Sequence, residues 1–397
     1  MIFFFCCIYL LVFYKAINSD FVFGNGILSV ITYGSFLPIF VIPTKYLTNN
    51  FLIKKIFTLI CIITILEILL GFVQITYSYI HTNNIAGDYI EGTIHPGLEP
   101  EASFSNPIFA TIISFSLIFI FSFQNHYGNK KLTILFGVII SLLASVVHVT
   151  LFILLAIIIS VILYRPNFFR KGIISKIIYP LIILLAVGPV SIQFMRLNKN
   201  IGNYYPVFLR LIKSEYPKTL AVSNFYNNET KNNLLITYFG LGPGQYLSRA
   251  SFISTGKYFG GPLSESQFKI PLTKMTKSFS KNLNDLWIDS IANIKWGRSV
   301  ISYPHSSWFA ILTEFGILGV TIVLFFLVKI IIKTKRNSII YDNNNLGFFV
   351  GSVSLGIFFL GFIENYWEIP QAIFIGLILS KLVYSCLMYP KSIRYNI

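Results

Sequence analysis

Three side chains in the second half of the chain have the chemistry needed to transfer a group away from a phosphate leaving group. Arg210 and Arg298 carry planar guanidinium groups, which can pair with two oxygens of a diphosphate and stay protonated. His305 is of the residue type best able to exchange a proton near neutral pH. The plainer interpretations are a contact with lipid headgroups for each arginine and a polar helix cap for the histidine.

The sequence predicts no metal and no other cofactor for this site. The chain has four cysteines, and all of them lie in apolar runs: Cys6, Cys7, Cys61 and Cys386. Such positions indicate neither a disulfide framework nor a metal centre. Chemistry here would therefore depend on the arginines and the histidine.

Composition shows which elements must position these residues. Hydrophobic residues make up 55% of the 397 positions and charged residues 12%, whereas soluble domains carry about 25% charged residues. About ten apolar runs are long enough to cross a bilayer. They lie at 2–17, 21–42, 55–78, 106–123, 132–147, 149–164, 173–194, 307–328, 346–363 and 370–389. We therefore predict an all-α polytopic membrane protein, whose first run is a helix and not a signal peptide.

Charged residues predict the orientation of these helices. Basic links follow the second, fourth, sixth, eighth and tenth runs, and acidic links fall between them. Lys and Arg in short loops favour the cytoplasm, so both termini are expected there. The segment 195–304 then becomes one large, partly helical periplasmic loop between helices 7 and 8, which divides the chain into 1–194, 195–304 and 305–397. This loop has 14 Lys and Arg against 5 Asp and Glu, and its excess charge favours an anionic ligand.

Local patterns add further expectations. "GLGPGQY" at 240–246 predicts a turn whose glycines permit positive φ or a close backbone approach. The segment 282–298 predicts an amphipathic helix at the membrane interface, with Trp287 on its apolar face. Glu67 and Glu314 lie inside apolar runs, where a carboxylate needs a partner or water; another helix or a wet cavity is expected for Glu314. A polar turn is expected at 148–150.

A second outer segment is acidic. "HPGLEPEASFSNP" at 95–107 contains Glu99 and Glu101 beside prolines. The segment resembles acidic, proline-containing segments of sugar polymerases, and this resemblance implies that the two carboxylates orient sugar hydroxyls; a solvated turn is the alternative interpretation.

Residues 305–319 resemble a known family. His305, Ser306, Gly316 and Gly319 fit the pattern H-[NSQ]-x9-G-x-x-G of the O-antigen ligase and O-antigen polymerase superfamily. "LTEFGILG" at 312–319 and "GLGPGQY" are similar to segments of the same family, and the resemblance covers roughly 150–330. It implies that His305 is the catalytic residue, and that Arg298 and Arg210 contact the diphosphate of the substrate.

The resemblance also implies the substrate and the location. The donor would be an undecaprenyl-diphosphate-linked oligosaccharide, used at the periplasmic face of the bacterial inner membrane by a metal-independent glycosyltransferase. Membrane lipid and a chain-length regulator protein are further expected partners, and nucleic acid is not. Length, composition and the acidic first loop favour a polymerase. The alternatives are an O-antigen ligase, which moves the polymer to lipid A–core, and a lipid-linked oligosaccharide transporter.

Overall fold

The described residues of this computed structural model are 2–43, 50–82, 89–96, 98, 106–127, 131–144, 146–166, 217–231, 233–258, 268–292 and 306–388. Within these ranges the chain forms helices and turns, and no strand. Five helices are long and apolar enough to cross a membrane, over Leu52–His81, Asn106–Phe123, Ser307–Ile340, Asn344–Phe362 and Pro370–Leu387. A helix satisfies its own backbone groups in hydrocarbon, and the predicted all-α membrane class is confirmed.

The chain folds into two compact units, each assembled from segments that are far apart in sequence. Unit 1 comprises 1–37, 206–327 and 361–370, and unit 2 comprises 38–205, 328–360 and 371–397. The long helix α15 (Ser307–Ile340) begins in unit 1 and ends in unit 2. The two units are described separately.

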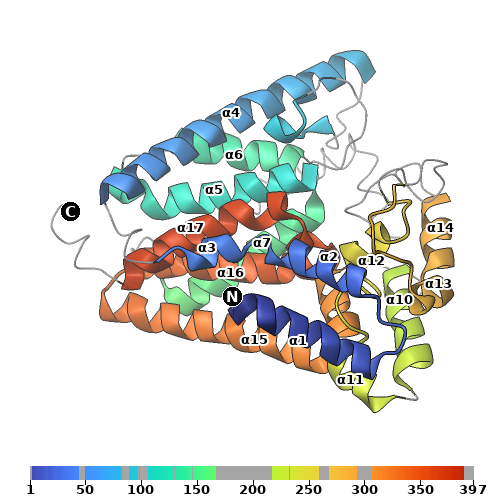
Figure 1. Cartoon of the computed structure of the whole chain (residues 1–397). Coiled ribbons are helices and arrows are strands. Elements are labelled where there is room, and N and C mark those ends of the chain that lie inside the picture. The colour runs from blue at the N-terminus through green and yellow to red at the C-terminus, as the bar shows by residue number, and fades with distance from the viewer. Residues whose placement is uncertain are drawn as a thin grey trace. The chain divides into compact units, whose positions relative to one another are not determined.

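Unit 2 contains most of the long apolar helices. Its elements are α3 (Leu37–Val41) from Pro38 onward, α4 (Asn50–Thr82), η3 (Gly92–Ile94), α5 (Asn106–Tyr127), α6 (Lys131–Leu143), α7 (Val147–Tyr164), α16 (Asn344–Ile363) up to Leu360 and α17 (Pro370–Met388) from Gln371. Helix α5 packs against α4, α6 and α7 (Figure 1). Phe109, Phe115 and Phe119 of α5 are fully buried, so α5 forms the centre of this unit.

Unit 1 joins the start of the chain to the segment that precedes α15. Its elements are α1 (Ile2–Ile17), α2 (Phe23–Gly34), α10 (Pro217–Phe225), the π-helical turn η6 (Tyr226–Thr230), α11 (Leu234–Phe239), α12 (Arg249–Ile253), α13 (Lys277–Asn282), α14 (Asn284–Ala292), the first part of α15 and η7 (Tyr366–Glu368). Helix α12 packs against α2, and α13 and α14 pack against α10 (Figure 1).

An aromatic cluster forms the core of unit 1. The ring centroids of Phe252 and Phe279 are 4.7 Å apart, and those of Phe252 and Trp287 are 5.1 Å apart. Trp287 is buried. The apolar face of α14 therefore packs inside the protein, and the predicted placement of this face at the membrane interface is wrong. The sequence pattern predicts an apolar helical face but does not identify whether membrane or protein contacts that face.

Two predicted boundaries also change. The apolar run 21–42 is two helices, because α2 ends at Gly34 and α3 begins at Leu37, just before Pro38. A proline restricts the preceding residue and lacks an N–H for the helix. Helix α6 ends at Leu143 and α7 begins at Val147, so the predicted turn at 148–150 is part of the first turn of α7. The predicted helix 173–194 lies outside the described residues.

Candidate functional site at the start of α15

All five site residues predicted from the sequence lie outside the described residues. These are His305, Arg298, Arg210, Glu99 and Glu101. The described segment resumes at Ser306, immediately after His305. The geometry around the start of α15 is therefore built from Ser306 onward.

Two serines attach the start of α15 to the connection between α16 and α17. The Ser306 hydroxyl donates to the carbonyl of Gly361 at 2.9 Å and accepts from the Phe309 N–H at 3.3 Å. The latter bond is a helix N-cap, which satisfies an otherwise unpaired N–H. Ser307 Oγ donates to the Glu364 carbonyl at 3.2 Å and accepts from the Trp367 N–H at 3.1 Å. The residue after His305 is thus anchored on both sides.

Glu314 holds the glycine-rich turn against α15. Its side chain is fully buried. Oε2 accepts from the Gly244 N–H at 2.6 Å, and Oε1 accepts from the N–H groups of Tyr246 and Ser248, both at 2.9 Å. The partner of this carboxylate is the backbone of the turn. The expectation of another helix or a wet cavity for Glu314 is therefore wrong.

The same turn also meets the main chain of α15. Leu241 N–H donates to the Thr313 carbonyl at 3.0 Å, and Gly242 N–H donates to the Glu314 carbonyl at 2.9 Å. Gly240 has φ +77°, and a Cβ there would collide with the backbone of Glu314. Gly316 has φ +64° and lies equally close to the backbone of Tyr238. Only glycine allows both the positive φ and this close approach. Gly240 and Gly316 therefore both permit the close packing of the glycine-rich turn against α15.

Residues near the start of the chain also bond to the segment that precedes α15. Asn18 Nδ2 donates to the Leu241 carbonyl at 3.0 Å, and Gln245 bonds both main-chain polar groups of Val22. Asn25 makes a similar pair of bonds with the main chain of Lys274. Asn18 and Gln245 thus join the α1–α2 segment to the glycine-rich turn, and Asn25 joins it to Lys274, although more than 200 residues separate the partners in sequence.

Two further carboxylates are buried in the connection between α16 and α17. Glu364 Oε1 lies 3.5 Å from Lys218 Nζ of α10. Burial raises the pKa of Glu364 to about 7, and the charge of Lys218 opposes this shift. Burial also raises the pKa of Glu368 to about 8, the charge of Glu314 raises it further, and Arg249 opposes it. Both groups can hold a proton near neutral pH.

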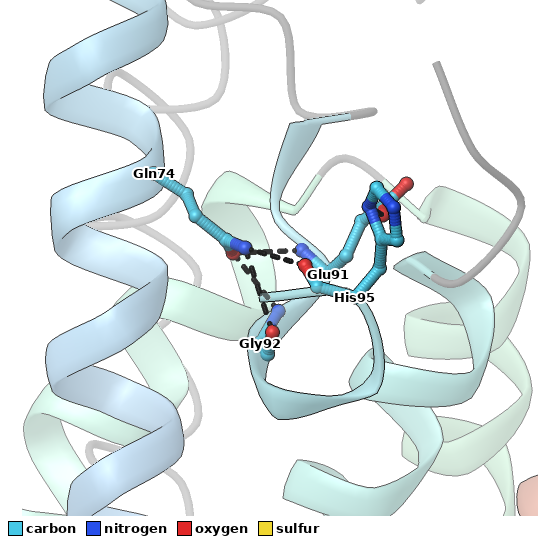
Figure 2. A network of polar contacts seen from close by, with 4 residues as sticks. All are labelled: Gln74, Glu91, Gly92 and His95. Carbon is cyan, nitrogen blue, oxygen red and sulfur yellow. Dashed lines mark hydrogen bonds and ion pairs between the residues drawn. The ribbon is translucent and has the colours of Figure 1, made fainter. Parts of the chain in front are cut away.

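Unit 2 contains a separate polar network at η3. Gln74 Oε1 accepts from the N–H groups of Glu91 at 3.0 Å and Gly92 at 2.9 Å, while Nε2 donates to the His95 carbonyl at 2.9 Å (Figure 2). Glu67, one of the carboxylates inside an apolar run, accepts from the N–H of Thr93 at 2.9 Å and from its hydroxyl. Two side chains of α4 thus hold the turn at η3, which leads into the acidic segment 95–107.

The side chains of His95 and Glu91 contact each other within this network. His95 Nδ1 lies 2.8 Å from Glu91 Oε2, and the side chains are 49% and 3% exposed. Figure 2 shows the ring of His95 beside the Glu91 carboxylate, above the turn that Gln74 holds. A buried carboxylate that orients a half-exposed imidazole was not predicted from the sequence.

Replacing Gln74 by alanine tests how firmly this turn is held. The substitution leaves the N–H groups of Glu91 and Gly92 without their acceptor, and each unmet buried group costs about 1–3 kcal/mol. We expect amide hydrogen exchange over 89–96 to accelerate at least about tenfold. Gln371→Ala, at an exposed position on α17, is the matched control and should leave exchange there unchanged. Equal exchange in both variants would contradict the role of Gln74.

Residues that could hold a metal do not gather in the described part of the chain. Within the described ranges, no group of three or more His, Cys, Asp or Glu side chains is arranged to hold an ion. The buried carboxylates found here are bonded to N–H groups, hydroxyls and cations. Glu67 and Glu314 hold neighbouring loops in place, and Glu364 and Glu368 can hold protons.

Comparison with known proteins finds no match: no protein-family model, no curated protein and no solved structure is similar to this chain.

Proposed function

We propose that this chain is an O-antigen polymerase, a membrane glycosyltransferase that joins undecaprenyl-diphosphate-linked repeat units at the periplasmic face of the bacterial inner membrane. The observation that carries the proposal is the contact through Glu314. The two segments on which the family resemblance rests, 240–246 and 312–319, are bonded to each other by this carboxylate and by two main-chain hydrogen bonds. Segments that serve one site are expected to meet in this way.

The proposed chemistry is transfer of a sugar from its diphosphate to a hydroxyl. The bond from sugar C1 to the diphosphate oxygen breaks, and negative charge grows on the leaving diphosphate. Arg298 and Arg210 would stabilise that charge more in the transition state than in the ground state. His305 would accept the proton of the attacking hydroxyl as the new C1–O bond forms. The reaction needs no metal ion in this scheme.

The intramembrane carboxylates favour an enzyme over a transporter. Transporters keep ionisable groups in the membrane available for ions or substrates. Both oxygens of Glu314 and both oxygens of Glu67 already accept hydrogen bonds from loops of the same unit. The oxygens of these two carboxylates are therefore occupied by hydrogen bonds that hold loops in place.

Deletion of the gene separates polymerase from ligase. A polymerase acts before the ligase, and a ligase can still transfer one repeat unit in its absence. We expect lipopolysaccharide to change from a ladder to core plus one repeat, and the intact gene should restore the ladder. In a host that makes a capsule, loss of high-mass polymer is the equivalent result.

Other bands would contradict the proposal. Bare core with lipid-linked polymer accumulating in the membrane would identify a ligase. Loss of both surface products, with unflipped repeat units retained inside the cell, would identify a transporter.

A further inference from the structure

The segment 268–281 of unit 1 presents exposed apolar side chains and lysines together. Phe268, Leu272 and Met275 are 62%, 83% and 37% exposed. The same segment contains no Asp or Glu, and its four lysines are all exposed: Lys269, Lys274, Lys277 and Lys281. Apolar side chains beside exposed lysines are typical of segments that lie at a membrane surface.

The core of unit 1 anchors this segment and leaves those apolar side chains outside. Ile270 packs against the aromatic cluster, to which Phe279 belongs. Thr276 Oγ1 donates to the Gln245 carbonyl at 2.7 Å and accepts from the Phe279 N–H at 3.1 Å. The backbone of the segment is therefore fixed at several points, and its exposed apolar side chains are not part of the core.

Leu272 has an unusual backbone conformation for an exposed leucine. Its φ is +66°, a region that is costly for a residue with a Cβ, and its side chain gains no burial in return. Asn25 fixes the main chain nearby, because its side chain donates to the Lys274 carbonyl at 2.8 Å and accepts from the Lys274 N–H at 3.0 Å. A Cβ at Gly24 would collide with the Leu272 carbonyl. A strained residue that its surroundings hold in place indicates a function for that residue.

The place of Leu272 beside α2 indicates what covers its side chain. Exposed apolar residues recur at every fourth position of α2, at Phe23, Ile27 and Ile31, and therefore share one face of the helix. An exposed apolar face of this kind contacts lipid in a membrane protein. Gly24, which contacts the Leu272 carbonyl, lies in the first turn of α2. Leu272 thus lies at the end of this apolar face, at the level expected for lipid headgroups.

The lysines of the segment supply positive charge at the same level. Lys277 Nζ lies 3.0 Å from Asp20 Oδ1, and this ion pair ties the segment to the link between α1 and α2. Among the described residues, no carboxylate lies within ion-pair distance of Lys269, Lys274 or Lys281. These three cations can therefore meet the phosphates of anionic lipids.

We propose that the segment 268–281 docks on anionic phospholipids at the membrane surface. Its three exposed apolar side chains enter the region between headgroups and acyl chains, and the three lysines that have no carboxylate partner among the described residues contact lipid phosphates. Lipid then covers the apolar surface that the protein itself leaves exposed. Lipid contact here is independent of the proposed polymerase activity, and the polymer ladder of the deletion strain does not test it.

A tryptophan in place of Leu272 measures the contact locally, because lipids with brominated acyl chains quench an indole that they touch. The full-length Leu272→Trp protein is placed in brominated nanodiscs of phosphatidylcholine alone, or of equal parts phosphatidylcholine and phosphatidylglycerol. The parent protein gives the background of the four native tryptophans. We expect the added indole to lose most of its fluorescence when phosphatidylglycerol is present. Asp285→Trp, at an exposed position of α14, is the matched control and should lose little.

Replacing the lysines tests the charge. Each lysine near an anionic surface favours binding about fivefold. Combining Lys269→Gln, Lys274→Gln and Lys281→Gln with Leu272→Trp should therefore reduce quenching in phosphatidylglycerol nanodiscs to the level found in phosphatidylcholine alone. Lys231→Gln removes an exposed lysine that follows η6 and should leave quenching unchanged.

Phe268→Trp is a second position for the probe if Leu272→Trp does not fold, because it exchanges one exposed aromatic side chain for another. Its quenching should depend on phosphatidylglycerol in the same way.

Three results would overturn the proposed docking. Quenching no greater than that of Asp285→Trp would place the segment in water. A blue-shifted emission without quenching would mean that protein, such as a second copy of this chain, covers Leu272. Equal quenching with and without phosphatidylglycerol, or unchanged quenching after the lysines are replaced, would show that the segment does not recognise anionic lipid.

Discussion

Replacement of His305 by alanine is expected to abolish polymer formation while the protein stays inserted and abundant. A general base contributes about 10²–10⁴ to the rate, so residual polymerisation should fall to about 1% or less. The anchoring of Ser306 to the carbonyl of Gly361 does not involve the imidazole, and we expect the start of α15 to stay attached. The measurement is glycan chain length on gels from cells that express each variant at matched levels.

His81→Ala is the control for this prediction. His81 is an exposed histidine near the end of α4, where Nδ1 bonds the carbonyl of Tyr77. Its removal should leave the ladder unchanged. Near-normal chain lengths in His305→Ala would exclude the histidine from the mechanism. Core plus one repeat in both variants would indicate that loss of any histidine damages the protein.

Replacement of Glu314 by alanine should strongly destabilise unit 1. Alanine forms helices well, and its transfer into hydrocarbon costs less free energy than that of a carboxylate. Hydrophobicity alone therefore predicts that the variant is more stable. The structure predicts the opposite sign, because the N–H groups of Gly244, Tyr246 and Ser248 lose their acceptor. At about 1–3 kcal/mol for each unmet group, the loss is comparable with the 5–15 kcal/mol that stabilises a typical domain.

The measurement is thermal unfolding in detergent, together with the protein level in membranes. Asp285→Ala removes an exposed carboxylate from α14 and should leave both quantities unchanged. Glu314→Gln should fall between the wild type and Glu314→Ala, because its one remaining oxygen can still accept from the turn while its amide N–H₂ cannot. A wild-type unfolding temperature in Glu314→Ala would contradict the role given to this carboxylate.

The helices and the membrane class follow from the sequence because their physical cause is local. A span needs about 20 apolar residues in succession, and a helix satisfies its backbone within itself. The predicted runs 106–123, 346–363 and 370–389 accordingly agree with α5, α16 and α17 to within a few residues. The sequence also indicated that Glu67 and Glu314 need partners, since the cost of a carboxylate in hydrocarbon depends on composition alone.

The partners themselves came only from the tertiary structure. Glu314 meets a turn some 70 residues earlier in the chain, Asn18 meets Leu241, and Arg249 meets Glu368. Glu364 and Glu368 lie in the acidic link between the runs 346–363 and 370–389, where the charge pattern predicts exposure to water, yet both side chains are buried. Trp287 lies on an apolar face of α14. The sequence pattern of that face fits contact with the membrane as well as contact with the protein interior. Such pairings depend on which distant segments pack together, and hydropathy and spacing along the chain carry no information about that packing.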